Sequence, residues 1–351
     1  MRPIQSIVGD EFDITRVQGD LHKITPAAGF KGLKKGEKTT IQFRGELWQL
    51  SEIDGMPNYY IAAEGLEPVI ISSTQLAVDA ETGMEVRPYV DAYTNSETQY
   101  KRRETDKLEW ATSSVLYNNN LNTPVDAVLA ENSILPTPAK VKLKAGELPV
   151  SLDAGLNVEL NDVGAAAVSA ALQRLARIGV KQSAKGVKTE LLPLTTSTSA
   201  GQYHLDISAE GIQIFAADDA GFSYGLASIA SLVNTETLAV NPIFIDDEPR
   251  YDFRGMHVDV SRNFHSKQLI LDLLDQMAAY KLNKLHLHMA DDEGWRLEIN
   301  GLPELTDIGS KRCHDLSEDT CLLPQLGSGP FSDAKVNGYY SKADYIEILQ
   351  Y

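Results

Sequence analysis

One strand, helix and strand pattern constrains the fold of this chain more than any other feature. "GMHVDVS" (255–261) and "KLHLHMA" (284–290) alternate apolar and polar residues as strands do. The segment between them, "SKQLILDLLDQMAAYKLN", has the apolar spacing of an amphipathic helix, with Ser266 as its N-cap. Elements in this order form a βαβ unit, so the sheet is predicted to be parallel. Polar residues at the C-terminal strand ends are then candidates for chemistry.

Length and charge limit the class of protein. A chain of 351 residues with 43% hydrophobic content is long enough for two or three domains with cores, and no apolar run approaches the ~18 residues of a membrane span. The net charge of −17 makes the surface acidic, which repels phosphate backbones and anionic lipid headgroups. These properties argue against nucleic-acid and membrane partners. The N-terminus, "MRPIQSIVGDEF", lacks the pattern of a signal peptide, so the chain is either cytoplasmic or without its leader.

The two cysteines, Cys313 and Cys321, indicate a compartment. A zinc site would need further Cys or His ligands at short spacing, and His314 is the one nearby. A small loop closed by a disulfide fits better. Because such a bridge needs an oxidising compartment, it favours a periplasmic or secreted protein whose leader is missing from this sequence. Two free thiols in a surface loop are the alternative.

Periodicity divides the chain into three regions. Residues 1–130 contain short strand-like segments between Gly, Pro and Asn turns, which is the pattern of an all-β sandwich. Residues 131–247 open on a proline-rich linker and mix helices with strands that we expect to be antiparallel, an α+β domain. Residues 248–351 hold two βα units at most. The helices of the α+β region are predicted from apolar residues in helical register, which are Val168, Leu172, Leu175, Ile178, Leu226, Ile229, Leu232 and Val233.

The third region carries a family resemblance. From "FRGMHVDVSRNF" (253–264) through "KLHLHMADDEGWR" (284–296) to "RCHDLSEDTCLLPQ" (312–325), it resembles the start of the catalytic (β/α)8 barrel of family 20 glycoside hydrolases, above all bacterial chitobiases. The upstream regions resemble the small domain that precedes this barrel and the carbohydrate-binding-like N-terminal domain of chitobiases. The resemblance implies an exo-acting β-N-acetylhexosaminidase that removes terminal N-acetylglucosamine from chitobiose and short chito-oligosaccharides, with no metal or organic cofactor.

The resemblance also implies roles for residues at the strand ends. Arg262 binds hydroxyls of the terminal sugar, Asp291 supports the catalytic network, and Asp292 binds sugar or caps the following turn. The physical chemistry suits these roles, because a guanidinium offers five donors in a rigid fork and a carboxylate can orient a histidine and tune its pKa. The alternatives are an ion pair between Arg262 and Asp259 and simple turn-forming roles for both aspartates.

Other polar residues of the region have structural interpretations. His286 and His288 share one face of their strand and are expected to fill the barrel interior rather than to bind metal. Arg254, Asp259 and Trp295 are interpreted as framework residues.

The sequence departs from the family at the catalytic pair. In family members the sugar's 2-acetamido oxygen attacks the anomeric carbon, a Glu protonates the leaving oxygen, and the preceding Asp orients the acetamido group. That pair lies on a later barrel strand in a His-x-Gly-x-Asp-Glu context, which the Asp-Glu pairs at 10–11, 247–248 and 292–293 lack.

Since a closed barrel takes about 250 residues, we expect an N-terminal portion of such an enzyme, inactive by itself. A shortened fragment and an incomplete gene product would both explain this. The alternative function is a non-catalytic carbohydrate-binding or structural module.

Overall fold

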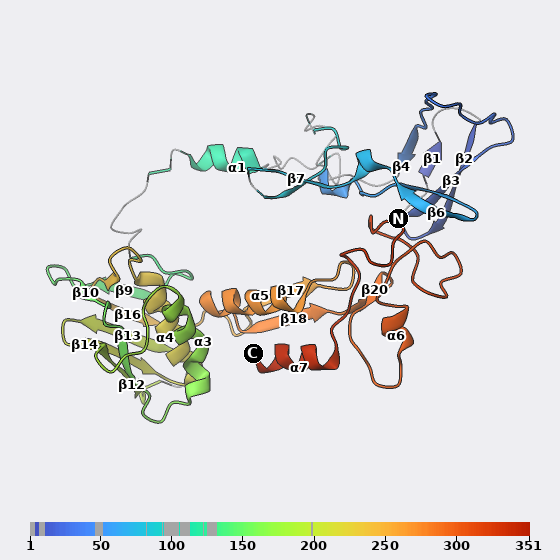
Figure 1. Ribbon diagram of the computed structural model, residues 1–351. Coiled ribbons are helices and arrows are strands. Elements are labelled where there is room, and N and C mark those ends of the chain that lie inside the picture. The colour runs from blue at the N-terminus through green and yellow to red at the C-terminus, as the bar shows by residue number, and fades with distance from the viewer. Residues whose placement is uncertain are drawn as a thin grey trace. The chain divides into compact units, whose positions relative to one another are not determined.

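The computed structural model describes residues 4–6, 11–45, 52–81, 83–92, 94, 105, 113–121, 123–124, 132–197 and 199–351 (Figure 1). The chain forms two compact units. The first contains Met1–Leu121, Asp259–His265 and His288–Gln350, and the second contains Asn122–Val258, Ser266–Leu287 and Tyr351. The predicted domain boundary at 130/131 lies outside the described residues, and the one at 247/248 lies inside the second unit.

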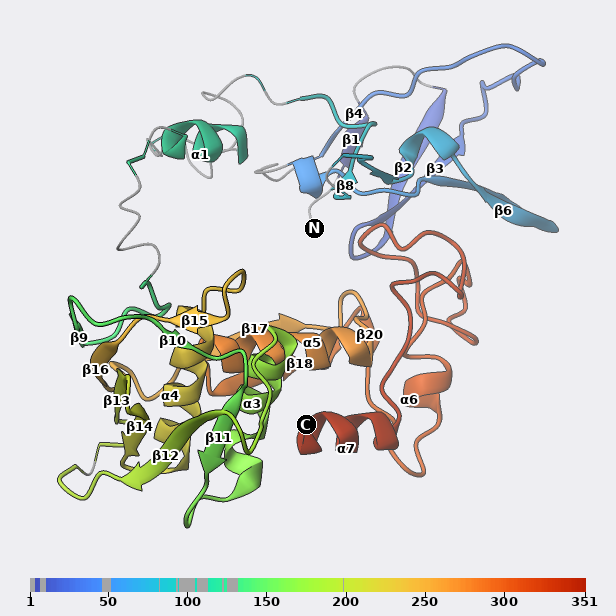
Figure 2. The ribbon, with the colours of Figure 1, turned by 60° about the vertical axis from the view of Figure 1, so that its left-hand side comes forward.

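A six-stranded sheet forms the core of the second unit, in the order β11-β12-β14-β13-β16-β9 (Figure 2). Its side chains alternate between buried and accessible along the central strands, as in a sheet with one covered face. β10 and β15 form a separate, short antiparallel pair. The strands are β9 (Lys140–Leu143), β10 (Val150–Ser151), β11 (Leu156–Glu159), β12 (Val187–Pro193), β13 (Tyr203–Ser208), β14 (Gly211–Ala216), β15 (Ala239–Val240) and β16 (Ile243–Asp247).

The sheet is mixed, so the expectation of antiparallel strands is wrong for part of it. β11 runs parallel to β12, and β12 runs parallel to β14, whereas the pairs β13–β14, β13–β16 and β16–β9 are antiparallel. The reason is a crossover: helix α3 (Ala165–Arg177) lies between β11 and β12 and returns the chain to the same end of the sheet. The apolar periodicity of β13 and β14 predicted the antiparallel hairpin that they form. It carried no information about the crossover from β11 to β12.

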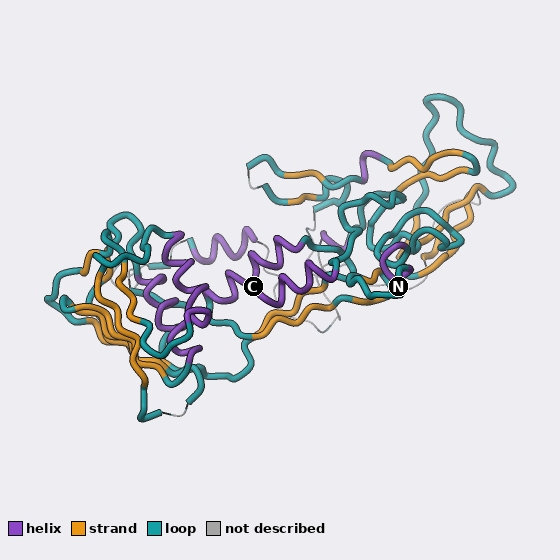
Figure 3. Tube along the Cα trace, turned by 60° about the horizontal axis from the view of Figure 1, so that its bottom comes forward, coloured by secondary structure: helices purple, strands orange, loops and turns teal. Residues whose placement is uncertain are grey.

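Two helices pack on one face of this sheet, α3 and α4 (Asp219–Leu232), as Figure 3 shows. α4 begins at Asp218, whose Oδ1 accepts a hydrogen bond from the Gly221 N–H at 2.9 Å. Gly225 brings this helix close to the sheet, because a Cβ there would lie 2.7 Å from Ile214 Cγ2. The apolar residues predicted for both helices belong to the core or pack against it: Val168, Leu172, Leu175, Ile178, Leu226, Ile229, Leu232 and Val233.

The predicted βαβ unit is present as β17 (Gly255–Asp259), α5 (Lys267–Ala279) and β18 (Lys284–His288). The Ser266 side chain caps α5 by accepting from the Leu269 N–H at 3.3 Å. The Asn283 N–H donates to the Arg254 carbonyl near the start of both strands, and the Val260 N–H donates to the His288 carbonyl at their end. The two strands are therefore parallel.

Smaller elements follow the βαβ unit. A tight hairpin comes first, and the last helix begins after Ser341. The elements are β19 (Ala290–Asp291), β20 (Gly294–Trp295), α6 (Glu304–Asp307) and α7 (Lys342–Gln350).

The N-terminal region is rich in short strands. Within the part of it that the structure describes, they form the antiparallel pairs β1–β4, β2–β3, β5–β6 and β7–β8, so the packed sheets of a sandwich stay a prediction. None of the described helices is both long and apolar enough to cross a membrane. The elements are β1 (Ile4–Ser6), β2 (Phe12–Gln18), β3 (Leu21–Pro26), β4 (Phe43–Gly45), η1 (Glu52–Asp54), β5 (Tyr60–Ala63), β6 (Leu66–Ile70), η2 (Ser72–Thr74), β7 (Ala77–Val78), β8 (Glu85–Val86) and α1 (Ser113–Asn120).

Candidate functional site

Arg262 lies in the loop that leaves the C-terminal end of β17. The last residue of that strand, Asp259, shapes the loop, because its Oδ1 accepts hydrogen bonds from the N–H groups of Ser261 and Arg262, both at 3.0 Å. The N–H groups of Val260 and Ser261 both donate to the His288 carbonyl at 3.1 Å. The loop is thus tied to the ends of both parallel strands, where the sequence predicted the site.

Three carboxylates surround the Arg262 guanidinium. Its Nη1 lies 2.5 Å from Asp259 Oδ2, its Nη2 lies 2.6 Å from Asp291 Oδ2, and its Nε lies 3.7 Å from Glu293 Oε2. The side chain nevertheless keeps 48% of its surface exposed. The ion pair with Asp259, considered above as an alternative, therefore exists beside a contact with Asp291. A guanidinium has five N–H donors, so contacts on three sides leave donors for a ligand.

Both aspartates are held in the charged form. For Asp259, burial opposes ionisation, but hydrogen bonds from the Arg262 backbone and side chain outweigh burial, so the pKa of Asp259 lies below its ordinary value. The pKa of Asp291 is lowered mainly by the hydrogen bond from the Asp292 N–H and then by the bond with His288. Asp291 is therefore suited to accept hydrogen bonds and to orient a neighbour, and unsuited to donate a proton near neutral pH.

The two strand histidines have different surroundings. His288 Nε2 lies 2.9 Å from Asp291 Oδ2, so this imidazole joins the charged cluster. His286 is exposed, and its ring lies edge-on to His257 of β17 with centroids 4.7 Å apart. No group of three or more His, Cys, Asp or Glu side chains within the described part of the chain is placed to hold a metal ion.

The other residues named from the sequence are Asp292 and Trp295, which belong to the β19–β20 hairpin, and Arg254, which precedes β17. Asp292 is exposed in the turn between β19 and β20, and its backbone N–H donates to Asp291 Oδ1 at 2.9 Å. Trp295 Nε1 donates to the Leu297 carbonyl at 2.5 Å. In the second unit, Arg254 donates to backbone carbonyls at 281 and 251 and to the hydroxyl of Tyr224, which fits a framework role.

Sequence reasoning missed a buried arginine beneath the cluster. Arg296 has no exposed surface. Burial, and then the nearby charge of Arg312, lower the pKa of the Arg296 guanidinium to about 10. Its three nitrogens donate to the backbone carbonyls of Val260, Ser261, Ser310, Val336 and Gly338 at 2.6 to 3.3 Å. Arg296 therefore ties the Arg262 loop to two later loops. The local sequence "GWR" could not predict the burial of Arg296, because its hydrogen-bond acceptors are main-chain atoms that are distant in sequence.

Arg312 supports Arg262 directly. It is fully buried, and its Nη2 donates to the Arg262 carbonyl at 2.6 Å and to Asn263 Oδ1 at 3.1 Å. Glu293 was also missed as a member of the site, although its side chain is only 16% exposed and approaches Arg262. The available signal was its position in the acidic run that follows β18.

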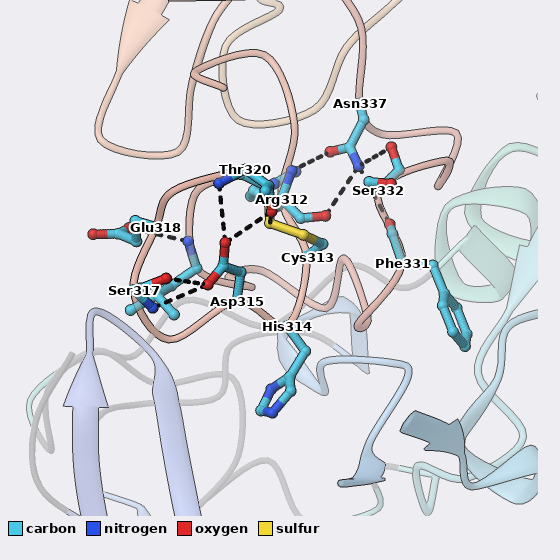
Figure 4. The surroundings of a disulfide bond; sticks show 12 residues. Arg312, Cys313, His314, Asp315, Ser317, Glu318, Thr320, Phe331, Ser332 and Asn337 are labelled. Atoms are coloured by element: carbon cyan, nitrogen blue, oxygen red, sulfur yellow. Dashed lines mark hydrogen bonds between the residues drawn. A yellow bond between two sulfur atoms is a disulfide. The ribbon is translucent and has the colours of Figure 1, made fainter. Parts of the chain in front are cut away.

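Cys313 and Cys321 form the predicted disulfide, which rules out two free thiols (Figure 4). Asp315 organises the loop between them, since its carboxylate accepts from the N–H and hydroxyl groups of both Ser317 and Thr320 at 2.6 to 3.1 Å. These bonds hold the pKa of Asp315 well below its ordinary value. The disulfide loop is therefore a compact, internally bonded element.

The cluster has the chemistry of a site for a neutral, hydroxyl-rich ligand. A half-exposed guanidinium can donate to ligand hydroxyls, while the ionised carboxylates beside it can accept from them. The opposing charges restrain the Arg262 side chain before a ligand arrives, which reduces the entropy lost on binding.

Comparisons with known proteins agree with these observations. The chain matches three family models: a carbohydrate binding domain (residues 1–114), glycosyl hydrolase family 20 domain 2 (131–248) and the glycosyl hydrolase family 20 catalytic domain (251–351). It is 43% identical to a beta-hexosaminidase of Vibrio vulnificus over 97% of this chain and 40% of the relative. It is 41% identical to the N,N'-diacetylchitobiase of Vibrio harveyi over 100% of this chain and 39% of the relative.

A solved structure is similar as well. The crystal structure of the GH20 exo beta-N-acetylglucosaminidase from Vibrio harveyi, in complex with N-acetylglucosamine, matches with a TM-score of 0.55 and 30% identity, covering 63% of this chain and 34% of that chain. The chain spans about two fifths of the length of the curated relatives described above.

Proposed function

The chain belongs to glycosyl hydrolase family 20, and we propose from this membership that the protein is an exo-β-N-acetylhexosaminidase. Its substrates would be chitobiose and short chito-oligosaccharides, from which it would remove the terminal N-acetylglucosamine. The observation that supports this most is the Arg262 guanidinium, half exposed and restrained by Asp259 and Asp291 at the C-terminal ends of parallel strands. This is where enzymes with parallel β/α architecture bind substrates.

The cluster residues receive separate roles in this proposal. Arg262 donates to two neighbouring hydroxyls of the terminal sugar and fixes the ring. Asp291 stays ionised and, through its contact with His288, supports the catalytic network. Asp292, exposed beside them, binds sugar or forms the turn. Attack by the 2-acetamido oxygen and protonation by a Glu would require the Asp-Glu pair in its His-x-Gly-x context, which these 351 residues lack.

The domain plan and location belong to the same proposal. We assign residues 1–130 to a carbohydrate-binding-like β-sandwich domain, 131–247 to the α+β domain, and 248–351 to the first two βα units of a (β/α)8 barrel. A periplasmic or secreted location follows from the disulfide between Cys313 and Cys321, because such bonds persist in oxidising compartments.

A chimera would test the activity. Residues 1–351 are joined to the part of a curated chitobiase relative that follows the aligned region, and hydrolysis of 4-nitrophenyl N-acetyl-β-glucosaminide is measured. Arg262→Ala should lower kcat/KM about a hundredfold, because two charge-assisted hydrogen bonds contribute roughly 3 kcal/mol together. Arg44→Ala, which changes an exposed arginine on β4, is the matched control. Equal kcat/KM values for the two variants would refute the role of Arg262.

The 351-residue chain itself should be inactive on the same substrate, because acid catalysis alone contributes roughly 10²- to 10⁴-fold. Measurable turnover by the purified chain would contradict this expectation. A chitin pull-down with the same protein examines the alternative of a carbohydrate-binding module. Retention on chitin together with an inactive chimera would favour that alternative.

A further inference from the structure

The disulfide loop, taken here as residues 312–330, contacts two other parts of the first unit. We infer that this loop is a docking platform that holds the N-terminal β-rich region on one face and the backbone of Arg262 on the other. The contacts alone support this docking. Its effect on sugar binding, through the position of Arg262, rests on the proposed function.

Among the described residues, three hydrogen bonds join the loop to the N-terminal region. The Asn58 side chain donates to the Gly327 carbonyl at 2.7 Å. The Tyr60 hydroxyl lies 3.1 Å from His314 Nδ1, and the two rings pack edge to face at 5.4 Å. The carboxylate of Asp20, in the β2–β3 turn, accepts from the backbone N–H at 326 at 2.9 Å. The contacts come from two hairpins that are separate in sequence, which favours a specific surface.

The fit between the two surfaces is close. Gly327 has φ of +70°, and a Cβ there would lie 2.3 Å from Pro57 Cδ, so a side chain has no room. On the other hairpin, a Cβ on Gly19 would lie 2.0 Å from Gln325 Oε1. Gln325 and Ser328 are both buried although they belong to a loop. The rigid Pro57 ring therefore requires a glycine at position 327, whereas the flexible end of Gln325 could move away from a side chain at position 19.

The opposite face of the loop reaches the candidate site. Arg312, next to Cys313, donates to the Arg262 carbonyl at 2.6 Å and to the Gln325 carbonyl at 3.1 Å. One guanidinium therefore bonds both to the backbone beneath the proposed sugar-binding side chain and to the segment of the loop that meets Gly19.

Charge complementarity links the two faces. Burial lowers the pKa of the Arg312 guanidinium to about 10, and the carboxylates of Glu293 and Asp20 act in the opposite direction. One of these acids belongs to the candidate site and the other to the N-terminal region. A buried cation is costly without such partners, so docking of the N-terminal region stabilises Arg312 in its place.

Hydrogen exchange of the 351-residue chain, measured by mass spectrometry without sugar, tests the platform. The double variant Asn58→Ala/Tyr60→Phe removes two hydrogen bonds and keeps one aromatic ring. We expect amides of residues 312–330 and of 259–265 to exchange about tenfold faster, since each of the two bonds contributes roughly a threefold change in the opening equilibrium. Glu64→Ala, in the exposed turn of the same β5–β6 hairpin, is the matched control and should change neither segment. Exchange in α7, which belongs to the same unit as both hairpins, reports whether that unit is still folded in the variant.

A second variant tests the platform from the other side. Cys313→Ser/Cys321→Ser opens the disulfide, and we expect faster exchange in residues 57–60 and 19–22 as well as in the loop. Faster exchange confined to the loop would overturn the inference, as would unchanged exchange at 259–265 in the Asn58→Ala/Tyr60→Phe variant. These exchange measurements need no substrate, so their outcome is independent of the hydrolase assay. In that assay, the chimera that carries Asn58→Ala/Tyr60→Phe should show a raised KM.

Discussion

Replacing the buried Arg296 by methionine should destabilise the first unit strongly. The guanidinium donates to five backbone carbonyls, and two of these also accept from a backbone N–H, at Ser310 from Gly338 and at Val336 from Phe264. Among the hydrogen bonds of the described residues, the other three carbonyls depend on Arg296, and they belong to Val260, Ser261 and Gly338.

The size of the effect follows from these three carbonyls. An unpaired buried carbonyl costs about 1 to 3 kcal/mol, so their sum is at least about 3 kcal/mol. Removing one partner from a buried charged network costs a similar amount, about 3 to 5 kcal/mol. Burial disfavours the charged guanidinium, which is why the pKa of Arg296 is lowered. Methionine carries no charge, so its introduction removes this desolvation cost and offsets part of the loss. We therefore expect the lower end, about 3 kcal/mol.

Urea denaturation combined with hydrogen exchange measures this loss. Arg296→Met should lower the free energy of unfolding by about 3 kcal/mol and raise exchange at residues 259–265 and 288–341, while α3 and α4 keep their protection. Arg262→Met is the matched control: its side chain is 48% exposed, and exposed ion pairs contribute about 1 kcal/mol or less. If both variants lose the same stability, the hydrogen bonds from Arg296 to the backbone carbonyls do not stabilise the first unit as proposed.

Three further predictions concern the site and the disulfide loop. In the chimera, Arg262→Ala should weaken substrate capture while its melting temperature stays near that of the parent; a large drop in melting temperature with unchanged activity per folded molecule would contradict this. Cys313→Ser/Cys321→Ser should lower the free energy of unfolding by about 2 to 3 kcal/mol, measured in urea without reductant, and no change would contradict the estimate. The folded pKa values of Asp259 and Asp291 are depressed, so their contribution to stability is complete above the unfolded value of about 3.9 and is lost as pH falls through the lower folded values. The urea midpoint should therefore fall less between pH 5 and pH 2.5 in Asp291→Asn than in the parent, and parallel curves would refute the coupling.

Local patterns in the sequence were sufficient for the elements that depend on near neighbours. Apolar spacing predicted α3, α4 and α5, and the Ser266 cap marked the start of α5 correctly, because a helix and its cap involve residues three or four apart. The βαβ unit followed from element order alone. Where a strand depended on a partner brought by a crossover, as β12 does on β11, the sequence pattern failed.

The candidate site was predictable in part. Arg262 and Asp291 were found from the family resemblance, and the structure brings them together at 2.6 Å. Their positions at the ends of neighbouring parallel strands explain this, since such ends meet at one edge. Asp259 was interpreted as framework, but it is also an ion-pair partner of Arg262, because the loop turns back over the strand end.

The sequence by itself determined helices α3, α4 and α5, the parallel βαβ unit, the pairing of two nearby cysteines and the acidic net charge, since each follows from short-range spacing or from composition. Only the tertiary structure decided that Arg296 and Arg312 are buried, that Glu293 turns toward Arg262, and that Asn58 meets Gly327 across 269 positions of sequence. An arginine reads as a surface residue until backbone carbonyls from distant loops surround it. Those carbonyls carry no side-chain signal, so their convergence is settled by packing and by the need to pair every buried polar group.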